Sequence, residues 1–119
     1  MSLDPTITDP EHYRVIFENE RVRVLEYTDQ PGESTRPHRH PDSVMYTLSS
    51  FRRRLVSGDA QRDVGLDTVG WLPAQQHHGE NVGDTPAHVI FVELKESGSD
   101  QPAKDGGAIG PQSIWGSLV

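Results

Sequence analysis

The sequence predicts an all-β fold, a sandwich or barrel of short strands in a single domain. Apolar residues alternate with polar ones in short segments and do not follow a helical stripe. Nine Pro and eleven Gly divide the 119 residues into pieces too short for long helices. Many short strands separated by turn residues are typical of sandwiches and barrels. A chain of this length has room for one domain with a workable core.

The predicted barrel spans residues 12–96, between an N-terminal arm at 1–11 and a tail at 97–119. The tail is rich in Gly, Ser and Pro, so we expect it to be irregular. Its apolar end, at 114–119, is expected to dock against the barrel or a neighbouring subunit.

Within the barrel, strands are predicted where polar and apolar residues alternate. Residues 87–94 are the strongest β segment, and their continuous apolar run predicts a strand buried on both faces. Residues 79–85 are predicted to form a polar loop. Further strands or extended segments are predicted at 13–17, 22–27, 35–40, 44–48 and 52–56. Turns are predicted at 19–20, 30–33 and 57–59.

Composition narrows the functional classes. The chain has no Cys, so disulfides, thiolate nucleophiles and thiolate metal sites are excluded. The net charge of −7 argues against a nucleic-acid partner, and the short cluster at 52–54 is expected to be a strand with charged side chains. No apolar run approaches the roughly 20 residues of a membrane helix. The N-terminus lacks the features of a secretory signal, so a cytoplasmic location is expected.

Four of the six histidines form two groups, His38 with His40 and His77 with His78. Residues two apart on a strand project to one face, so His38 and His40 can direct both imidazoles to one point. Taken alone, this spacing also describes a solvated polar strand. The remaining two have no partner at ligand spacing and are expected to be structural or surface residues: His12 and His88.

These groups resemble the two motifs of the cupin superfamily. The first motif has Gly, five residues, His-x-His, then Glu and a later Gly, and it matches at Gly32, His38 and His40. The second has a Pro, a His and an Asn, and it matches at Pro73 and Asn81. The resemblance covers residues 13–96 and implies a single cupin-type double-stranded β-helix, or jelly-roll, barrel.

The resemblance also implies a divalent metal ion held by His38, His40 and a third histidine. His77 keeps the family spacing to Asn81, whereas His78 keeps the spacing from Pro73 and is the alternative. Three imidazoles suit Fe, Zn, Ni, Mn or Cu, and spacing does not choose among them.

Two positions depart from the cupin pattern. The motif Glu falls at Val44 and the later Gly is replaced by Phe51. The predicted site is therefore a three-histidine face with open positions for water or substrate. Neutral imidazoles leave the ion its full charge, so the site should polarise a bound anionic oxygen strongly.

Four residues are candidates for the substrate pocket. Gln75 lies two residues before His77 and can share its face as an outer partner or fourth ligand. Val44 and Tyr46 are expected to face inward, and Tyr46 is a weak candidate for proton transfer. Arg53 either reaches into the barrel to pair with a substrate carboxylate or faces outward on an edge strand.

Two functions remain open at this point. One is a metal-dependent enzyme acting on a small oxygenated or carboxylate metabolite, with dioxygenase-like or Lewis-acid isomerase or lyase chemistry. The alternative is a non-catalytic small-molecule binding or sensor protein in which the metal is structural or absent. The resemblance further implies a homodimer that pairs through residues 13–17.

Overall fold

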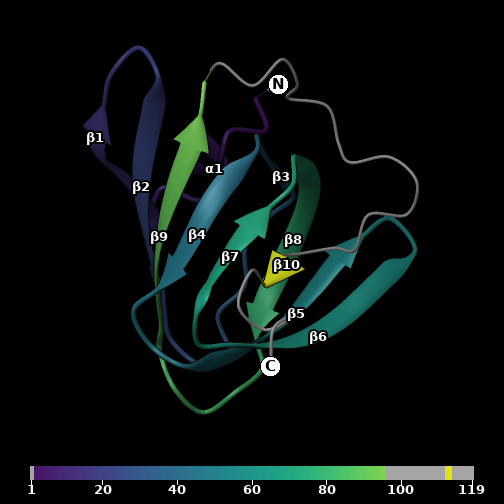
Figure 1. Ribbon diagram of the computed structural model, residues 1–119. Helices are drawn as coiled ribbons and strands as arrows, with labels where there is room; N and C mark the ends of the chain where they lie inside the picture. The colour runs from purple at the N-terminus through teal and green to yellow at the C-terminus, as the bar shows by residue number, and fades with distance from the viewer. Residues whose placement is uncertain (1, 96–111, 114–119) are drawn as a thin grey trace.

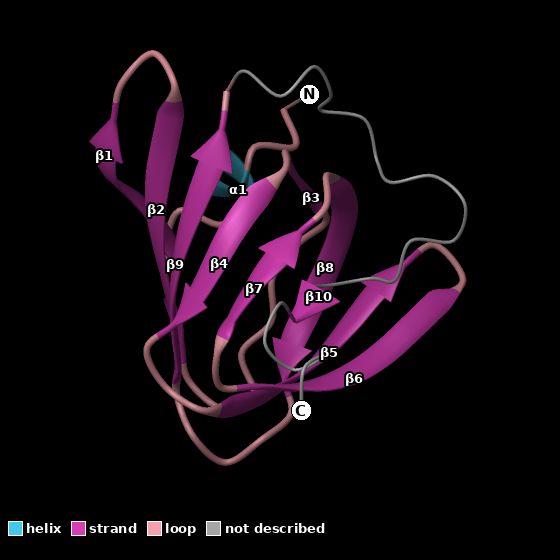
Figure 2. Cartoon of the chain, viewed as in Figure 1, coloured by secondary structure: helices cyan, strands magenta, loops and turns pink. Residues whose placement is uncertain are grey.

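The computed structural model describes residues 2–95 and the backbone of residues 112 and 113. One short helix, α1 (Pro5–Thr8), accompanies the strands (Figures 1 and 2). In chain order these are β1 (Tyr13–Glu18), β2 (Val22–Asp29), β3 (His38–His40), β4 (Ser43–Thr47), β5 (Phe51–Ser57), β6 (Ala60–Leu66), β7 (Val69–Leu72), β8 (Gln75–Asn81), β9 (Ala87–Leu94) and β10 (Gln112–Ser113).

The strands form two antiparallel sheets. One has the order β1-β2-β9-β4-β7-β10 and the other the order β3-β8-β5-β6 (Figure 1). Side chains from both sheets meet between them in one core, which includes Leu25 and Phe91 from the first sheet and Phe51 from the second. This arrangement confirms the predicted all-β barrel. No helix in the described part of the chain is long and apolar enough to cross a membrane.

β9 shows how alternation builds this core. Its residues alternate between buried and half-buried, so Val89 and Phe91 face the interior and Ile90 faces the other side. The predicted burial on both faces is therefore wrong. The apolar run reflects the central position of β9, between β2 and β4, because each side chain still packs on neighbouring strands.

The turn predictions hold at two places where the backbone requires glycine. Gly32 has φ +87° in the turn at 30–33, and Gly58 has φ +58° in the hairpin that joins β5 and β6. The loop predicted at 79–85 begins later, because Gly79 to Asn81 belong to β8. The sequence pattern did not reveal β6, since its side chains are mostly polar and exposed.

The N-terminal arm is integrated with the barrel and contains α1. Asp4 caps this helix by accepting a hydrogen bond from Thr6 N at 2.8 Å, and Pro5 occupies the first turn. The carbonyl of Leu3 accepts a hydrogen bond from Arg39 N at 2.7 Å, so the arm lies along β3. The predicted tail lies outside the described residues, apart from β10, which pairs with β7.

Candidate metal centre

Three histidines converge between the sheets. His38 and His40 come from β3, and His77 comes from the adjacent strand β8, directly opposite His38. Their ring centroids lie 4.8 to 5.2 Å apart, and one nitrogen from each ring lies within 4.8 Å of the others. Metal–imidazole bonds of about 2.0–2.1 Å would require the rings to close inward by less than about 1 Å. His78, the alternative third histidine, faces the other side of β8.

Hydrogen bonds set the tautomers of His38 and His77. His38 Nδ1 donates to Arg36 O at 2.7 Å. His77 Nδ1 donates to Gln75 Oε1, also at 2.7 Å, while Gln75 Nε2 donates to Pro73 O at 3.1 Å and so fixes the amide orientation. Each ring therefore presents the lone pair of Nε2 to the centre. Gln75 occupies the outer position that the sequence suggested.

His40 faces a carboxylate. Its Nδ1 lies 3.5 Å from Glu93 Oε2, and both atoms are buried without a hydrogen bond. The other oxygen, Glu93 Oε1, accepts a hydrogen bond from Arg23 Nε at 2.8 Å, and Arg23 in turn pairs with Asp4 of the arm. A carboxylate behind the distal nitrogen is a common way to orient a metal-ligating histidine. This pair fits a metal at Nε2.

Burial keeps two of the three imidazoles neutral. It lowers the pKa of His38 to about 3, with the nearby His40 as a second cause, and it lowers the pKa of His77 well below its ordinary value. Both imidazoles are thus uncharged at neutral pH and able to coordinate. A buried set of nitrogen donors fits a divalent ion of the first transition row.

A tyrosine also reaches the centre, although it is not the one predicted. The hydroxyl of Tyr13, on β1, lies 3.4 Å from Nε2 of both His38 and His40. Burial raises the pKa of Tyr13 above its usual range, so it remains a neutral phenol that can donate.

Tyr46, the predicted proton-transfer candidate, is 52% exposed and does not line the cavity. Val44 is half-buried on the same outer face, whereas Met45 faces the cavity. The expected parity of β4 was wrong by one residue, because the turn at Pro41 and Asp42 resets the alternation between β3 and β4.

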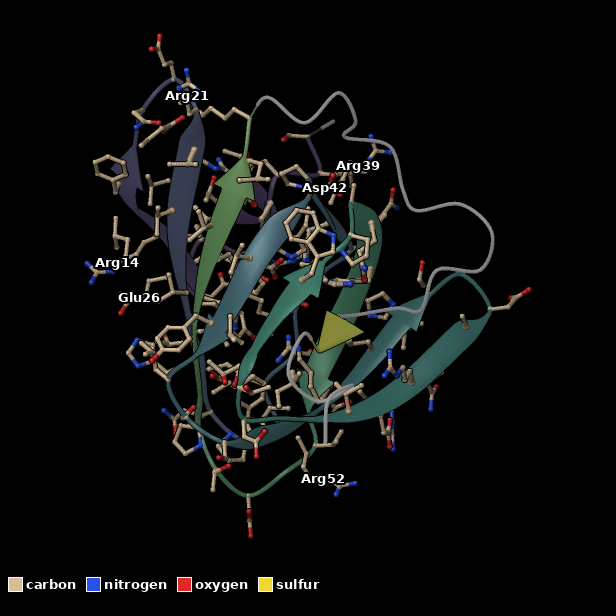
Figure 3. The ribbon with its side chains drawn as sticks, in the orientation of Figure 1. Arg14, Arg21, Glu26, Arg39, Asp42 and Arg52 are labelled. Carbon is tan, nitrogen blue, oxygen red and sulfur yellow. The ribbon has the colours of Figure 1, made fainter. Side chains whose placement is uncertain are left out.

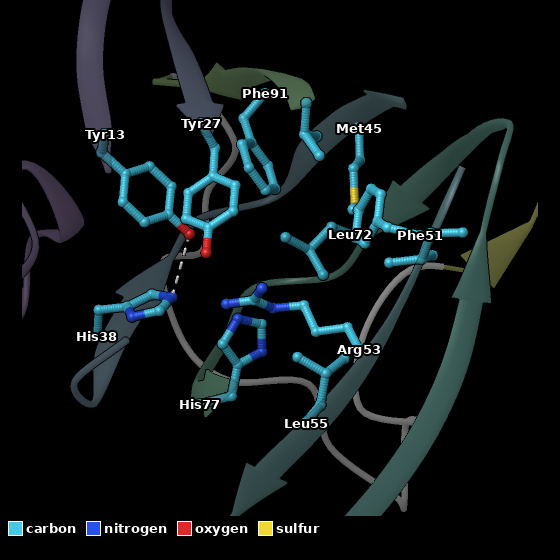
Figure 4. Close-up of a pocket in the computed structure, with 12 residues that line it drawn as sticks. Tyr13, Tyr27, His38, Met45, Phe51, Arg53, Leu55, Leu72, His77 and Phe91 are labelled. Carbon is cyan, nitrogen blue, oxygen red and sulfur yellow. Dashed lines mark hydrogen bonds between the residues drawn. The ribbon is translucent and has the colours of Figure 1, made fainter. Parts of the chain in front are cut away.

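His38 and His77 lie at one end of a cavity (Figure 4). The empty space between its walls is about 400 Å³ when space open to solvent is included, and the part that water-sized spheres can enter, measured to their centres, is about 30 Å³. The polar part of its wall comes from Tyr13, His38 and His77 together with Tyr27 and Arg53. The rest is apolar and is formed by Met45, Phe51, Leu55, Leu66, Leu72, Val89 and Phe91.

Arg53 lies inside the barrel. Its side chain is 8% exposed, its Nη1 donates to Asp29 Oδ2 at 2.7 Å, and its guanidinium lies 5.0 Å from the centroid of the Tyr27 ring. Asp29 also accepts hydrogen bonds from the Tyr27 hydroxyl and, at 3.0 Å, from Asn81 Nδ2. The outward alternative for Arg53 is wrong, because β5 lies between β8 and β6 and directs this side chain to the interior.

The neighbours of Arg53 on β5 point the other way. Arg52 is exposed and extends from the lower end of the molecule (Figure 3), and Arg54 pairs with Asp63 at 2.9 Å. On the adjacent strand, a Cβ at Gly79 would meet Arg53 Nε at 2.7 Å. Glycine at this position therefore makes room for the buried guanidinium.

The remaining predicted residues fall outside the cluster. His12 Nδ1 contacts Thr28 O at 2.9 Å, and His88 pairs with Glu26 at 2.7 Å, which agrees with structural and surface roles. Sequence reasoning missed Tyr13, Asp29 and Glu93. The two acids had a detectable signal, since each is a buried residue of a strand whose other buried residues are aliphatic or aromatic.

A scan against protein-family models found no match, and a search among curated proteins found none. Solved structures do match. A cupin domain from Bordetella pertussis Tohama I has 28% identity and a TM-score of 0.65, covering 70% of this chain and 91% of its own. A double-stranded β-helix protein from Klebsiella pneumoniae has 20% identity and a TM-score of 0.57, covering 72% and 78%. The polyketide cyclase RemF from Streptomyces resistomycificus has 21% identity and a TM-score of 0.53, covering 73% and 66%.

These likenesses and the strand arrangement define the class: the chain is a small cupin with a single double-stranded β-helix barrel. Within this class it is a cupin with three clustered buried histidines, and no carboxylate lines its cavity among the described residues.

Proposed function

We propose that this cupin binds one divalent metal ion through Nε2 of His38, His40 and His77. The observation that carries the proposal is the orientation of the three rings. In each, Nδ1 faces an oxygen and Nε2 is left for the shared centre. When bound, the ion would act as a Lewis acid toward a ligand oxygen or, if it is iron, would support oxygenase chemistry.

The ligand in this proposal is a small oxygenated or carboxylate metabolite that enters the cavity beside the histidines. Tyr13 donates a hydrogen bond to a ligand oxygen at the centre, since its hydroxyl is already within 3.4 Å of two of the Nε2 atoms. The apolar wall, which includes Leu72 and Phe91, excludes water from the bound ligand. Dioxygenase-like chemistry and Lewis-acid isomerase or lyase chemistry both use this arrangement.

A non-catalytic binding or sensor role is the second candidate. Val44 stands where the cupin motif has Glu, and the neighbouring Met45 contributes an apolar thioether to the cavity wall. An ion held by histidines alone in a largely apolar cavity also suits ligand capture without turnover.

Metal content tests the proposal directly. Protein purified without a histidine tag should contain close to one metal ion per chain by elemental mass spectrometry. His77→Ala should lose the ion, whereas His78→Ala, the matched control on the other face of β8, should keep it. Metal loss in both variants, or a metal-free wild type that takes up no divalent ion on titration, would refute the site.

An oxygen-uptake screen separates the two candidate functions. Metal-loaded protein is mixed with small diketones, thiols and keto acids, and uptake is compared with that of His77→Ala. Substrate-dependent uptake that requires His77 selects the oxygenase. Ligand binding by calorimetry, with no uptake and no conversion of the ligand by mass spectrometry, selects the binder.

We also propose that the chain forms a homodimer through β1. This strand is at the edge of the six-stranded sheet, and it exposes 43% of Val15, 45% of Ile16 and 54% of Phe17. An apolar edge strand can add to the same strand of a second copy. Sedimentation analysis should give a dimer that Phe17→Lys converts to a monomer, and a monomeric wild type would refute it.

A further inference from the structure

The charges around the cavity are asymmetric. Among the described residues, Arg53 is the one arginine in the cavity lining, which contains no Lys, Asp or Glu. The nearest balancing charge is Asp29, which lies behind Arg53 and Tyr27 and is not part of the cavity wall. With Arg53 and Asp29 balancing each other, a divalent ion at the histidines would add two positive charges with no lining carboxylate to oppose them.

The Asp29 carboxylate has several hydrogen-bond partners, whereas the Arg53 guanidinium has donors left for a ligand. The Asp29 carboxylate accepts three hydrogen bonds, from Tyr27, Arg53 and Asn81. Arg53 donates from Nη1 to Asp29, and its guanidinium has further N–H groups at the cavity surface. Figure 4 shows the guanidinium extending across the cavity toward His77. Asp29 and the Tyr27 ring thus hold in place a donor that can meet a second anion.

The rest of the wall, which includes Met45 and Phe51 on the side away from His38 (Figure 4), has different chemistry. Met45, Phe51, Leu66 and Leu72 carry no charge and no strong hydrogen-bonding group. A ligand in the cavity therefore meets both a positive charge and a hydrocarbon surface. A polyol or a dicarboxylate would leave polar groups unpaired against this apolar wall.

We propose that the ligand is a small organic monoanion whose carboxylate lies between the metal ion and Arg53, with a short apolar body against Met45, Phe51, Leu66 and Leu72. This inference rests on the proposed metal site and narrows its substrate class. Arg53 acts as the specificity residue, because a guanidinium pairs with a planar carboxylate more strongly than with a neutral amide.

Calorimetric titration of the cobalt-loaded protein tests the ligand class with three probes. These are 4-methyl-2-oxopentanoate, its neutral amide, and oxalate, which has a charged head without an apolar body. The branched acid should bind about tenfold to a hundredfold more tightly than the amide, because a hydrogen-bonded charge is lost. It should also bind more tightly than oxalate. Equal affinity for the acid and the amide overturns the proposal.

Variants assign the effect to Arg53. Arg53→Gln is combined with Asp29→Asn, so that no buried carboxylate is left unpaired, and should lose most of the preference for acid over amide. Arg53→Lys keeps the positive charge but lacks the planar guanidinium, and it should retain part of the preference for acid over amide. Arg54→Gln is the matched control, because it removes an adjacent arginine that pairs outside the cavity with Asp63. A double variant with unchanged acid preference refutes the role of Arg53.

Metal content measured on the same samples separates this inference from the metal proposal. One ion per chain with no acid preference refutes the inference and leaves the metal site standing. If the wild type binds no ion, the metal proposal fails, and carboxylate binding by Arg53 is tested on metal-free protein. Binding of the acid to the metal-free protein that depends on Arg53 supports this role of Arg53. No such binding refutes it.

Discussion

Replacing Glu93 by Gln probes the link between the N-terminal arm and the metal ligands. Glu93 Oε2 faces His40 Nδ1 at 3.5 Å, while Oε1 accepts from Arg23 Nε at 2.8 Å. In Glu93→Gln the amide oxygen can keep the Arg23 contact, which places the amide NH₂ toward His40. Two donors then face each other, which disfavours the tautomer whose Nε2 binds a metal.

The expected loss of metal affinity is about 10- to 100-fold, the usual cost of removing a partner behind a metal-ligating histidine. That range corresponds to about 1.4 to 2.7 kcal/mol. Competition between the protein and a chromophoric chelator for Zn²⁺ or Co²⁺ at pH 7.5 measures it without reference to activity. Arg23 keeps two contacts to Asp4, at 2.8 and 3.2 Å, so the arm should stay in place.

Glu26→Gln is the matched control, because Glu26 also contacts a histidine, His88, and an arginine, Arg14, but on the outer face of β2 (Figure 3). It should leave the metal affinity unchanged. Equal dissociation constants for wild type and Glu93→Gln would refute the reasoning, as would equal losses in both variants.

Three further predictions concern stability. In the metal-free protein the pKa of His38 is lower in the folded state than in the unfolded chain, so the unfolded chain takes up a proton on this ring at higher pH. The free energy of unfolding should therefore fall as pH drops from about 6.5 toward 3, by up to about 1.4 kcal/mol per pH unit for each such histidine. Urea titrations at several pH values would measure this, and a flat profile contradicts it. Metal at a hundred times its dissociation constant should add about 2.7 kcal/mol at neutral pH, and this gain should persist well below pH 6.5, because burial lowers the pKa of His38 in the folded protein to about 3; identical melting curves with and without chelator oppose it. Gly79→Ala should cost about 1–3 kcal/mol, because its Cβ meets Arg53 Nε at 2.7 Å, whereas Gly65→Ala, with open space around it, should be near neutral; similar melting temperatures for the two would refute the steric argument.

Sequence alone could predict features that depend on local alternation. The spacing of His38 and His40 places both on one face of a strand whatever the rest of the fold, and the cupin resemblance indicated where the third histidine lies in the chain. The structure then brings His77, and not His78, to the pair.

Features that depend on distant contacts or on parity across a turn could not be predicted in this way. The exposed Tyr46 and the inward Met45 differ from expectation because a turn at Pro41 and Asp42 intervenes, and alternation does not carry through such a turn. Tyr13 reaches the histidines from β1, a strand of the other sheet, and no local pattern distinguishes it from a core tyrosine.

The arm that lies along β3 ties the start of the described chain to the residues that would hold the ion. Leu3 O occupies a backbone donor of this three-residue edge strand, and Asp9 accepts a hydrogen bond from Arg36 N at 2.9 Å beside His38. A covered edge is not available to pair with a foreign strand. Detaching the first nine residues would therefore expose the backbone of β3 and leave its two histidines less firmly oriented. Aggregation and loss of metal would then have the same cause.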